Sequence, residues 1–379
     1  MRRCLFAVSF VLCLAPALLA ARIERPDIPT DPDALFALAN RVVTAANARL
    51  VNGPQGPSVI GADVHLAVEP LLLTLDARRD ALTTHGLAYT AAQTEVTLVS
   101  TERSARSARL RVLERTTFAL HSDAAGAPPE TIVEREHVID CARTPHGWIA
   151  VADTIQDDDA LAPASDPSVD PHVVVPAIAV DDSVMHDDAS VATRRSGWPV
   201  QALGRTYDRS AVAWYARRWV GTIDSMSTSG YNPNYVAYYQ HDCSNFASQS
   251  IAWGGFPQVK GFYWLASSWW YDTWAWPRIH TDSWSIANTL KAFFAQSSRV
   301  TLLSSIRDLR VGDVLQADWE GDGWVDHSAI VTGRDSNGNI WLTYHSYNKK
   351  DIPFWDFDAA AKSRNKNVKY YRWHLADAF

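Results

Sequence analysis

One cysteine of the chain stands in a context that suits nucleophilic chemistry. Cys243 follows Asp242, an expected helix N-cap, and opens a stretch with helical apolar spacing that Gly254 would end. The first turn of a helix offers unpaired backbone N–H groups and the positive end of the helix dipole. Both favour a thiolate and the oxyanion that forms when a thiolate attacks a carbonyl, so the pattern indicates acyl-transfer chemistry. Two alternatives remain open, a buried inert cysteine and a disulfide with Cys141.

Two histidines downstream could supply the base. His327 begins a predicted strand that ends at a hairpin turn over 335–339, and His345 ends the next predicted strand, 340–345. Two histidines on adjacent strands, after a helix-start cysteine, indicate a base and a group that orients it. Asn348 is the alternative orienting group if the strand register differs.

Other side chains are candidates for contacts with a substrate. Gln240 and Tyr239, with Tyr231 as a further alternative, could donate a second hydrogen bond to the oxyanion, and spacing does not choose among them. An aromatic stretch over 262–284 includes Trp269, Trp270 and Trp274, which could stack on sugar rings or line a peptide cleft. The alternative for these tryptophans is that they pack together as core.

The acidic segment 318–326 has the spacing of a calcium loop in part. Asp318, Glu320, Asp322 and Asp326 fit, but Ala329 stands where such a loop has its bidentate glutamate. We therefore favour a plain hairpin turn, leave calcium binding open, and expect a mechanism without metal or cofactor.

The elements that must hold these residues form two predicted domains of α+β type. A helix from Asp31 and alternating strands over 94–99, 108–112, 131–141 and 148–152 predict a small α+β domain, 30–155, like the cystatin-like or nuclear-transport-factor-like modules. Residues 156–204 are rich in Asp and Pro and predict a linker. Tryptophans then dominate a second domain, 205–379.

The N-terminus has the pattern of an export signal. A short basic start is followed by an apolar stretch to Ala20 and Ala21, which predicts a signal peptide over 1–21 and a secreted protein, periplasmic or extracellular. A membrane anchor is the weaker alternative because Pro16 interrupts the short stretch, so no stable membrane insertion is expected after signal removal. The formal charge of -7 argues against a nucleic-acid binder.

The motifs together resemble one known family. Asp242-Cys243-Ser244-Asn245-Phe246, Gly312-Asp313-Val314 and Asp326-His327-Ser328-Ala329-Ile330-Val331 are similar to the "putative amidase domain" family, a branch of the papain-like fold shared with NlpC-type and CHAP cell-wall hydrolases. The resemblance covers roughly 205–375. It implies Cys243 as nucleophile, His327 as base and His345 as the residue that orients His327.

The expected function is therefore a secreted cysteine amidase or peptidase that hydrolyses amide bonds in cell-wall peptides, with peptidoglycan as partner and substrate. Two alternatives remain open. One is a secreted toxin or effector that uses the same thiol chemistry on a protein target. The other is a non-catalytic module that binds wall or glycan through its tryptophans.

Overall fold

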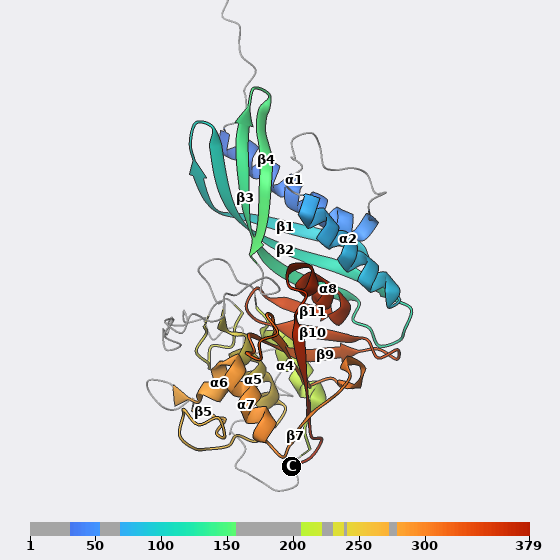
Figure 1. Ribbon diagram of the computed structural model, residues 1–379, viewed down its shortest axis with the longest axis vertical. Coiled ribbons are helices and arrows are strands. Elements are labelled where there is room, and N and C mark those ends of the chain that lie inside the picture. The colour runs from blue at the N-terminus through green and yellow to red at the C-terminus, as the bar shows by residue number, and fades with distance from the viewer. Residues whose placement is uncertain (1–30, 54–68, 157–205, 222–229, 239–240, 273–278) are drawn as a thin grey trace, which may run out of the picture.

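The computed structural model describes residues 31–53, 69–156, 206–221, 230–238, 241–272 and 279–379, and it is an α+β fold built on one large antiparallel sheet (Figure 1). The strand order is β1-β2-β3-β11-β10-β9-β8-β12-β7, and β4 pairs with β3 beside this path. The predicted α+β class is thus confirmed. The predicted signal peptide and linker lie outside the described residues. None of the described helices combines the length and apolarity that a bilayer-spanning segment needs.

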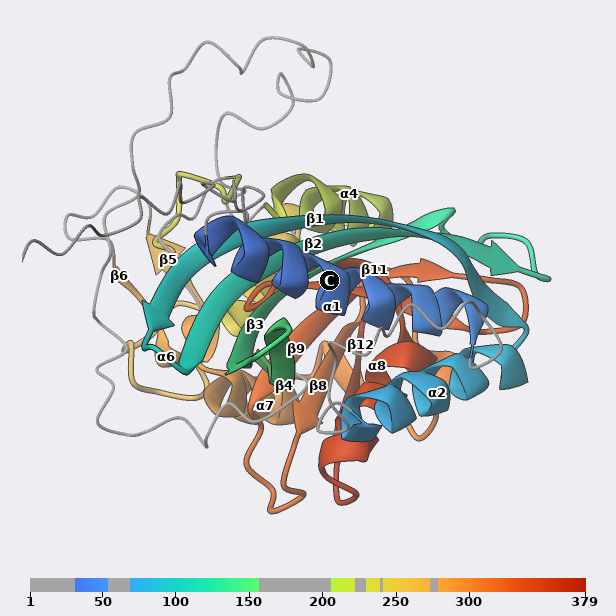
Figure 2. The same cartoon turned by 90° about the horizontal axis from the view of Figure 1, so that it is seen from above.

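We call the first part of the chain, up to residue 156, the N-terminal module; its described residues form two helices and a four-strand meander. Helix α1 lies along the curved strands (Figure 2). The predicted helix and four strands are confirmed, but the strands are longer than expected and helix α2 was not predicted. The elements are α1 Asp31–Asn52, α2 Glu69–Thr84, β1 Leu87–Arg103, β2 Ser107–Ser122, β3 Glu130–Thr144 and β4 Gly147–Gln156.

The second part carries the cysteine helix and the remaining strands. Its helices are α4 Arg209–Trp219, α5 Cys243–Trp253, α6 Asp282–Ser285, α7 Ala287–Gln296, the 3-10 helix η4 Ile306–Asp308 and α8 Phe354–Arg364. Its strands are β5 Tyr271–Asp272, β6 Ile279–His280, β7 Val300–Leu302, β8 Val314–Asp318, β9 His327–Arg334, β10 Ile340–Tyr344, β11 Lys349–Pro353 and β12 Lys369–Leu375. Strands β8, β9 and β10 pair antiparallel in the predicted order.

Helix α5 is covered on all sides. The sequence predicted one apolar face, yet every residue from 243 to 252 is buried. The aromatic side chains of Trp269, Trp284 and Phe293 belong to the same core cluster as Phe246 and Ile251 of α5. A helix that is wrapped in this way has little freedom to move the residue at its start.

The core between the two parts of the chain is shared. One cluster of buried side chains includes Phe118 and Val133 of the N-terminal module together with Trp341 and Phe354 of the second part. Strand β3 also pairs with β11, with Val133 opposite Lys349. The predicted domain boundaries stay a prediction, but the two parts bury apolar surface against each other.

A buried ion pair crosses the same interface. The guanidinium of Arg78 in α2 donates to both carboxylate oxygens of Asp356 in α8, at 2.6 and 3.0 Å. Tyr89 in β1 donates a third hydrogen bond to that carboxylate at 2.7 Å. The guanidinium holds the pKa of Asp356 below its usual range despite the burial. The Asp356 carboxylate is therefore charged and fully hydrogen-bonded between α2 and α8.

Candidate active site

Cys243 is the first residue of helix α5, as predicted, and only 7% of its surface is exposed. Cys243 and Cys141 are not joined in a disulfide, which removes that alternative. Cys141 is buried in β3, where desolvation raises the pKa of its thiol to about 12. At neutral pH Cys141 is therefore a protonated thiol within the N-terminal module.

Two contacts bring the start of α5 to the start of strand β9. The Cys243 Sγ lies 3.9 Å from the carbonyl oxygen of Asp326, and the hydroxyls of Ser244 and Ser328 lie 2.8 Å apart. Asp326 and Ser328 flank His327 in the chain. The contacts of residues 243 and 244 thus fall on the two chain neighbours of His327, so the start of α5 lies against the start of β9.

The side chain of Gln316 in β8 holds the contact between Ser244 and Ser328 in place. Its side-chain N–H donates to the Ser328 hydroxyl and to the Ala287 carbonyl, each at 2.9 Å. Its carbonyl oxygen accepts from the Trp373 indole at 2.8 Å. Both the N–H and the carbonyl of the Gln316 amide are thus hydrogen-bonded, and each of its partners is buried. This amide therefore fixes the position of Ser328 and of the Ser244 hydroxyl bonded to it.

Asp242 stands at the N-cap position of α5 but does not cap the helix with its side chain. One carboxylate oxygen accepts from the Tyr238 backbone N–H at 2.9 Å and from the Asn245 amide at 2.8 Å. The other oxygen contacts His345 Nδ1 at 2.5 Å. The predicted capping role of Asp242 is therefore wrong in its detail, because its carboxylate ties three neighbouring segments to the residue before Cys243.

His345 has a different neighbour from the one predicted. Its Nδ1 contacts Asp242, and its Nε2 lies 2.7 Å from the Trp219 carbonyl oxygen. Tyr231 and Phe246 stack on the two sides of the ring, with centroids 3.6 and 3.9 Å away. Both ring nitrogens face these acceptors, so the expected role of His345 in orienting His327 is corrected: it supports Asp242 instead.

The imidazole of His327 is almost fully buried among aromatic rings. Tyr344 meets it edge to face at 4.5 Å between centroids, and Trp319 lies at 5.8 Å. The His327 side chain is only 2% exposed. Such rings limit the orientations open to the imidazole, which is a requirement for a general base.

The acidic segment beside His327 is a turn closed by hydrogen bonds. The Asp318 carboxylate accepts from the backbone N–H groups of Gly321, Asp322 and Gly323, as the predicted hairpin turn requires. Oxygens of Asp318, Glu320 and Asp326 lie within 4.8 Å of one another, an arrangement that could also hold a cation. Desolvation, with the neighbouring carboxylates adding to it, raises the pKa of Asp326 to about 7.

The remaining predicted site residues divide into three groups. Gln240, Tyr239 and Trp274 lie outside the described residues. Trp269 is fully buried, and its indole donates to the Ser248 hydroxyl at 3.0 Å. Its predicted role in binding substrate is therefore wrong, because it packs as core. Trp270 is partly exposed and stays a candidate.

Comparisons with known proteins bear on this site. Residues 206–373, which we call the amidase domain, match the family model described as "Putative amidase domain". The match includes Cys243, His327 and the strands around them, and it confirms the predicted resemblance to that family. The description indicates hydrolysis of amide bonds.

Two curated proteins are similar to part of this chain. The chain is 27% identical over 184 residues to the uncharacterized protein YhbB of Bacillus subtilis (strain 168), covering 47% of this chain and 53% of that protein. It is 29% identical over 132 residues to the uncharacterized protein YjcM of the same organism, covering 32% and 28%. The chain thus spans about half or less of the length of these relatives.

Two solved structures show a weak likeness. The Kfla4162 protein from Kribbella flavida covers 34% of this chain and 90% of its own, at 18% identity and a TM-score of 0.25. The intermembrane space region of the chloroplast protein ARC6 covers 32% and 95%, at 16% identity and a TM-score of 0.22. At these TM-scores neither likeness carries an argument about fold or function.

Some side chains that contact the start of α5 were left unassigned by the sequence pattern. The Ser244–Ser328 pair was missed, although a signal for it exists: Asp242-Cys243-Ser244 and Asp326-His327-Ser328 share the pattern Asp-X-Ser. Each serine follows a residue of the predicted pair, and the two bond to each other. Ser346, whose hydroxyl accepts from the Asp242 backbone N–H at 3.1 Å, carried no sequence signal.

Proposed function

We propose that the amidase domain is a cysteine hydrolase of amide bonds in which Cys243 is the nucleophile and His327 the base. The single observation that supports this most is the pair of contacts that bracket His327, Cys243 to the Asp326 carbonyl and Ser244 to Ser328. A thiol at the buried start of a helix, packed against the start of a strand that begins with a histidine, fits the arrangement that thiol acyl transfer needs.

The reaction would proceed through a thioester. The Cys243 thiolate attacks the carbonyl carbon, and the N–H groups at the start of α5 donate to the resulting oxyanion. The protonated His327 gives its proton to the leaving amine as the C–N bond breaks. A water then loses a proton to His327 and attacks the thioester, which releases a carboxylic acid and restores the thiol. Gln240 and Tyr239 remain the proposed second oxyanion donors.

We further propose that this domain is papain-like. The support is the packing of the cysteine helix α5 against β9, the antiparallel strand that begins at His327. Helix α5 also lies against β10, the strand that precedes His345.

Cell-wall peptides are the proposed substrate. The support is the export pattern at the N-terminus, which would bring the mature protein to the periplasm or the cell exterior, and a group of exposed apolar side chains. Phe262, Tyr263, Trp264 and Leu265 are each at least 41% exposed, and the rings of Phe262 and Trp264 stack at 5.0 Å. Aromatic faces of this kind suit a substrate that contains sugar rings.

The same exposed group favours the second candidate, a non-catalytic wall-binding module. That role needs the aromatic side chains but has no use for a reactive Cys243. It predicts binding of wall fragments without turnover.

The test is mass spectrometry of muropeptides after incubation with the wild type, Cys243→Ala and a matched control, Cys141→Ala. Cys141 is the right control because it is the other described cysteine and is buried away from α5. We expect wild type and Cys141→Ala to release the same fragments, and Cys243→Ala to lose activity by at least about 10³-fold. Equal fragment release by Cys243→Ala would refute the proposed nucleophile.

A further inference from the structure

The turn that joins β10 to β11 has a backbone that its residues seldom adopt. Ser346 has a φ of 70° and Tyr347 a φ of 58°, both in the left-handed region, although neither is glycine. Asp351, just beyond, has a φ of 53°. Non-glycine residues keep this conformation only where their surroundings hold it, and such positions cluster at functional sites.

One side of this turn holds the residue before the nucleophile. The Ser346 hydroxyl accepts from the Asp242 backbone N–H, and His345 contacts the Asp242 carboxylate. Asn348 accepts from the Tyr231 hydroxyl at 2.9 Å, and the Tyr231 ring stacks on His345. The position of the turn therefore sets the position of Asp242 and, through it, the start of α5.

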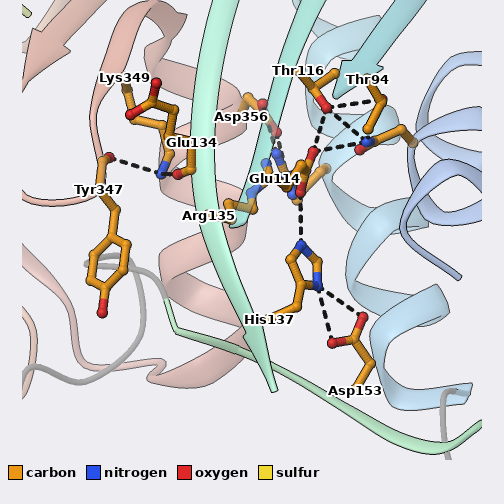
Figure 3. Close-up of polar contacts among 12 residues, drawn as sticks. Thr94, Glu114, Thr116, Glu134, Arg135, His137, Asp153, Tyr347, Lys349 and Asp356 are labelled. Carbon is orange, nitrogen blue, oxygen red and sulfur yellow. Dashed lines mark hydrogen bonds and ion pairs between the residues drawn. The ribbon is translucent and has the colours of Figure 1, made fainter. Parts of the chain in front are cut away.

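The other side of the turn is held by the N-terminal module. Lys349 is fully buried, and its ammonium donates to the carbonyl oxygens of Glu134 at 3.0 Å and Tyr347 at 3.2 Å (Figure 3). The Glu134 backbone N–H donates to the Asn348 carbonyl at 2.9 Å. The Thr131 hydroxyl donates to the Asp351 carbonyl at 2.7 Å. The contacts of Glu134 and Thr131 join β3 of the module to the turn or to β11, and the contact between Lys349 and Tyr347 joins β11 to the turn.

A buried ionic network fixes β3 in turn. His137 lies between the carboxylates of Glu114, at 2.8 Å, and Asp153, at 3.0 Å (Figure 3). Arg135, the neighbour of Glu134, lies 3.6 Å from the Glu114 carboxylate. Strands β2, β3 and β4 thus meet in one buried network. This network holds β3 rigidly, and with it the Glu134 carbonyl that accepts from Lys349.

We infer that the N-terminal module positions the nucleophile of the proposed hydrolase, and that Lys349 is the positioning residue that carries this effect. The route runs from β3 through Lys349 to the left-handed turn, and from Ser346 and His345 to Asp242. The inference rests on the proposed function of Cys243. By this inference the N-terminal module shapes the active site of the amidase domain, although the module supplies no group that touches the substrate.

The experiment measures how fast iodoacetamide labels Cys243 as a function of pH, read by mass mapping of the labelled peptide. The variants are Lys349→Met, which keeps the side chain's length without its ammonium, and Lys350→Met as the matched control. Lys350 is the next residue of β11, pairs with Ile132 of the same β3, and is partly exposed beside Glu130 at 3.7 Å. The charged groups named around Cys243, namely Asp242, Asp326, His327 and His345, are the same in all variants.

We expect Lys349→Met to slow labelling at pH 7 by about 10-fold or more and to move the midpoint of the pH profile upward. The reason is that a displaced start of α5 no longer points its backbone N–H groups at the Cys243 thiolate, which is then less stabilised. The limiting rate at high pH should stay within about twofold of wild type. Lys350→Met should match wild type throughout. A merely structural role of Lys349 would change unfolding but leave the profile in place.

Superimposable profiles for wild type and Lys349→Met would overturn the inference. If Lys349→Met fails to fold, Thr131→Val decides, since it removes a module-side donor to the Asp351 carbonyl: an upward shift supports the inference and an unchanged profile overturns it. Failure of the proposed function is measured by a different readout, the cleavage of muropeptides. Labelling could respond to Lys349 while muropeptides stay intact, whereas a wild-type Cys243 that never reacts would end both proposals.

Discussion

At the scale of single residues, the two histidines differ in what they touch. His327 lies between Asp326, which contacts Cys243, and Ser328, which contacts Ser244. Both nitrogens of His345 are engaged by Asp242 and the Trp219 carbonyl. Residue types alone could indicate that a helix-start cysteine needs a histidine. They could not assign the partner of His345, because that depends on a ring stacked between Tyr231 and Phe246.

This difference predicts unequal losses on substitution. His327→Ala removes the group that moves the proton and should lower kcat/KM by about 10²- to 10⁴-fold. His345→Asn keeps a side-chain N–H for Asp242 and should lose about 10-fold or less, while His345→Leu should lose more than His345→Asn. Steady-state kinetics on a peptide amide measure the three variants. Equal losses for His327→Ala and His345→Asn would contradict the assignment of His327 as the base.

At the scale of elements, the helix that carries Cys243 is held by close packing on α4. Gly254, just after α5, stands where an added Cβ would lie 2.2 Å from Val212 Cγ2 and 2.9 Å from Tyr207 Cε2. The sequence indicated Gly254 as a helix terminator, and it does follow α5, but its φ of -66° is one that any residue can adopt. Glycine is needed at this position because there is no room for a Cβ between α5 and α4. The residue pattern within α5 could not reveal this, because the obstructing side chains lie outside α5.

Gly254→Ala should therefore lower the free energy of unfolding by about 1–3 kcal/mol, the usual range for overpacking. Chemical denaturation at constant pH measures the loss. Val212→Ala removes the nearest obstructing methyl groups, so the double variant should be more stable than the sum of the two single losses implies. Strict additivity would show that the α4–α5 contact is not the cause.

At the scale of the whole molecule, the sheet and one core cluster run through both parts of the chain. The alternating strands of the module were readable from the sequence because each buries one face. The pairing of β3 with β11 was not, since it joins residues 132 and 133 to residues 349 and 350 by long-range contact. The ionic network of the module is equally hidden, because His137 looks like an ordinary strand residue until Glu114 and Asp153 surround it.

This network predicts a specific pH dependence of stability. The carboxylates of Asp153 and Glu114 outweigh desolvation and raise the pKa of His137 to about 10, from an ordinary value of 6.5. A raised folded-state pKa gives stability that is complete below pH 6.5 and is lost as the pH rises toward 10. Between pH 6.5 and 8 the free energy of unfolding should fall ever more steeply on account of His137, approaching about 1.4 kcal/mol per pH unit near pH 8.

Urea denaturation across pH 6.5–8 measures this fall. His137→Gln keeps hydrogen-bonding capacity but cannot titrate, so the difference between wild type and this variant isolates the effect of His137 from that of the other histidines. The variant should be less stable at pH 6.5, and the gap should narrow as the pH rises. A gap that stays constant over this range would mean that His137 is not charged in the folded protein.

The central claim is that Cys243 is the nucleophile, and a titration of activity against label tests it most directly. The wild type is treated with increasing iodoacetamide at pH 7, and the fraction of Cys243 labelled, read by peptide mass mapping, is compared with the hydrolytic activity left in the same sample. We predict that activity falls in proportion to the Cys243 label, reaches background at one label per chain, and leaves the Cys141 peptide unlabelled. Full activity in a chain whose Cys243 is completely labelled would contradict the claim.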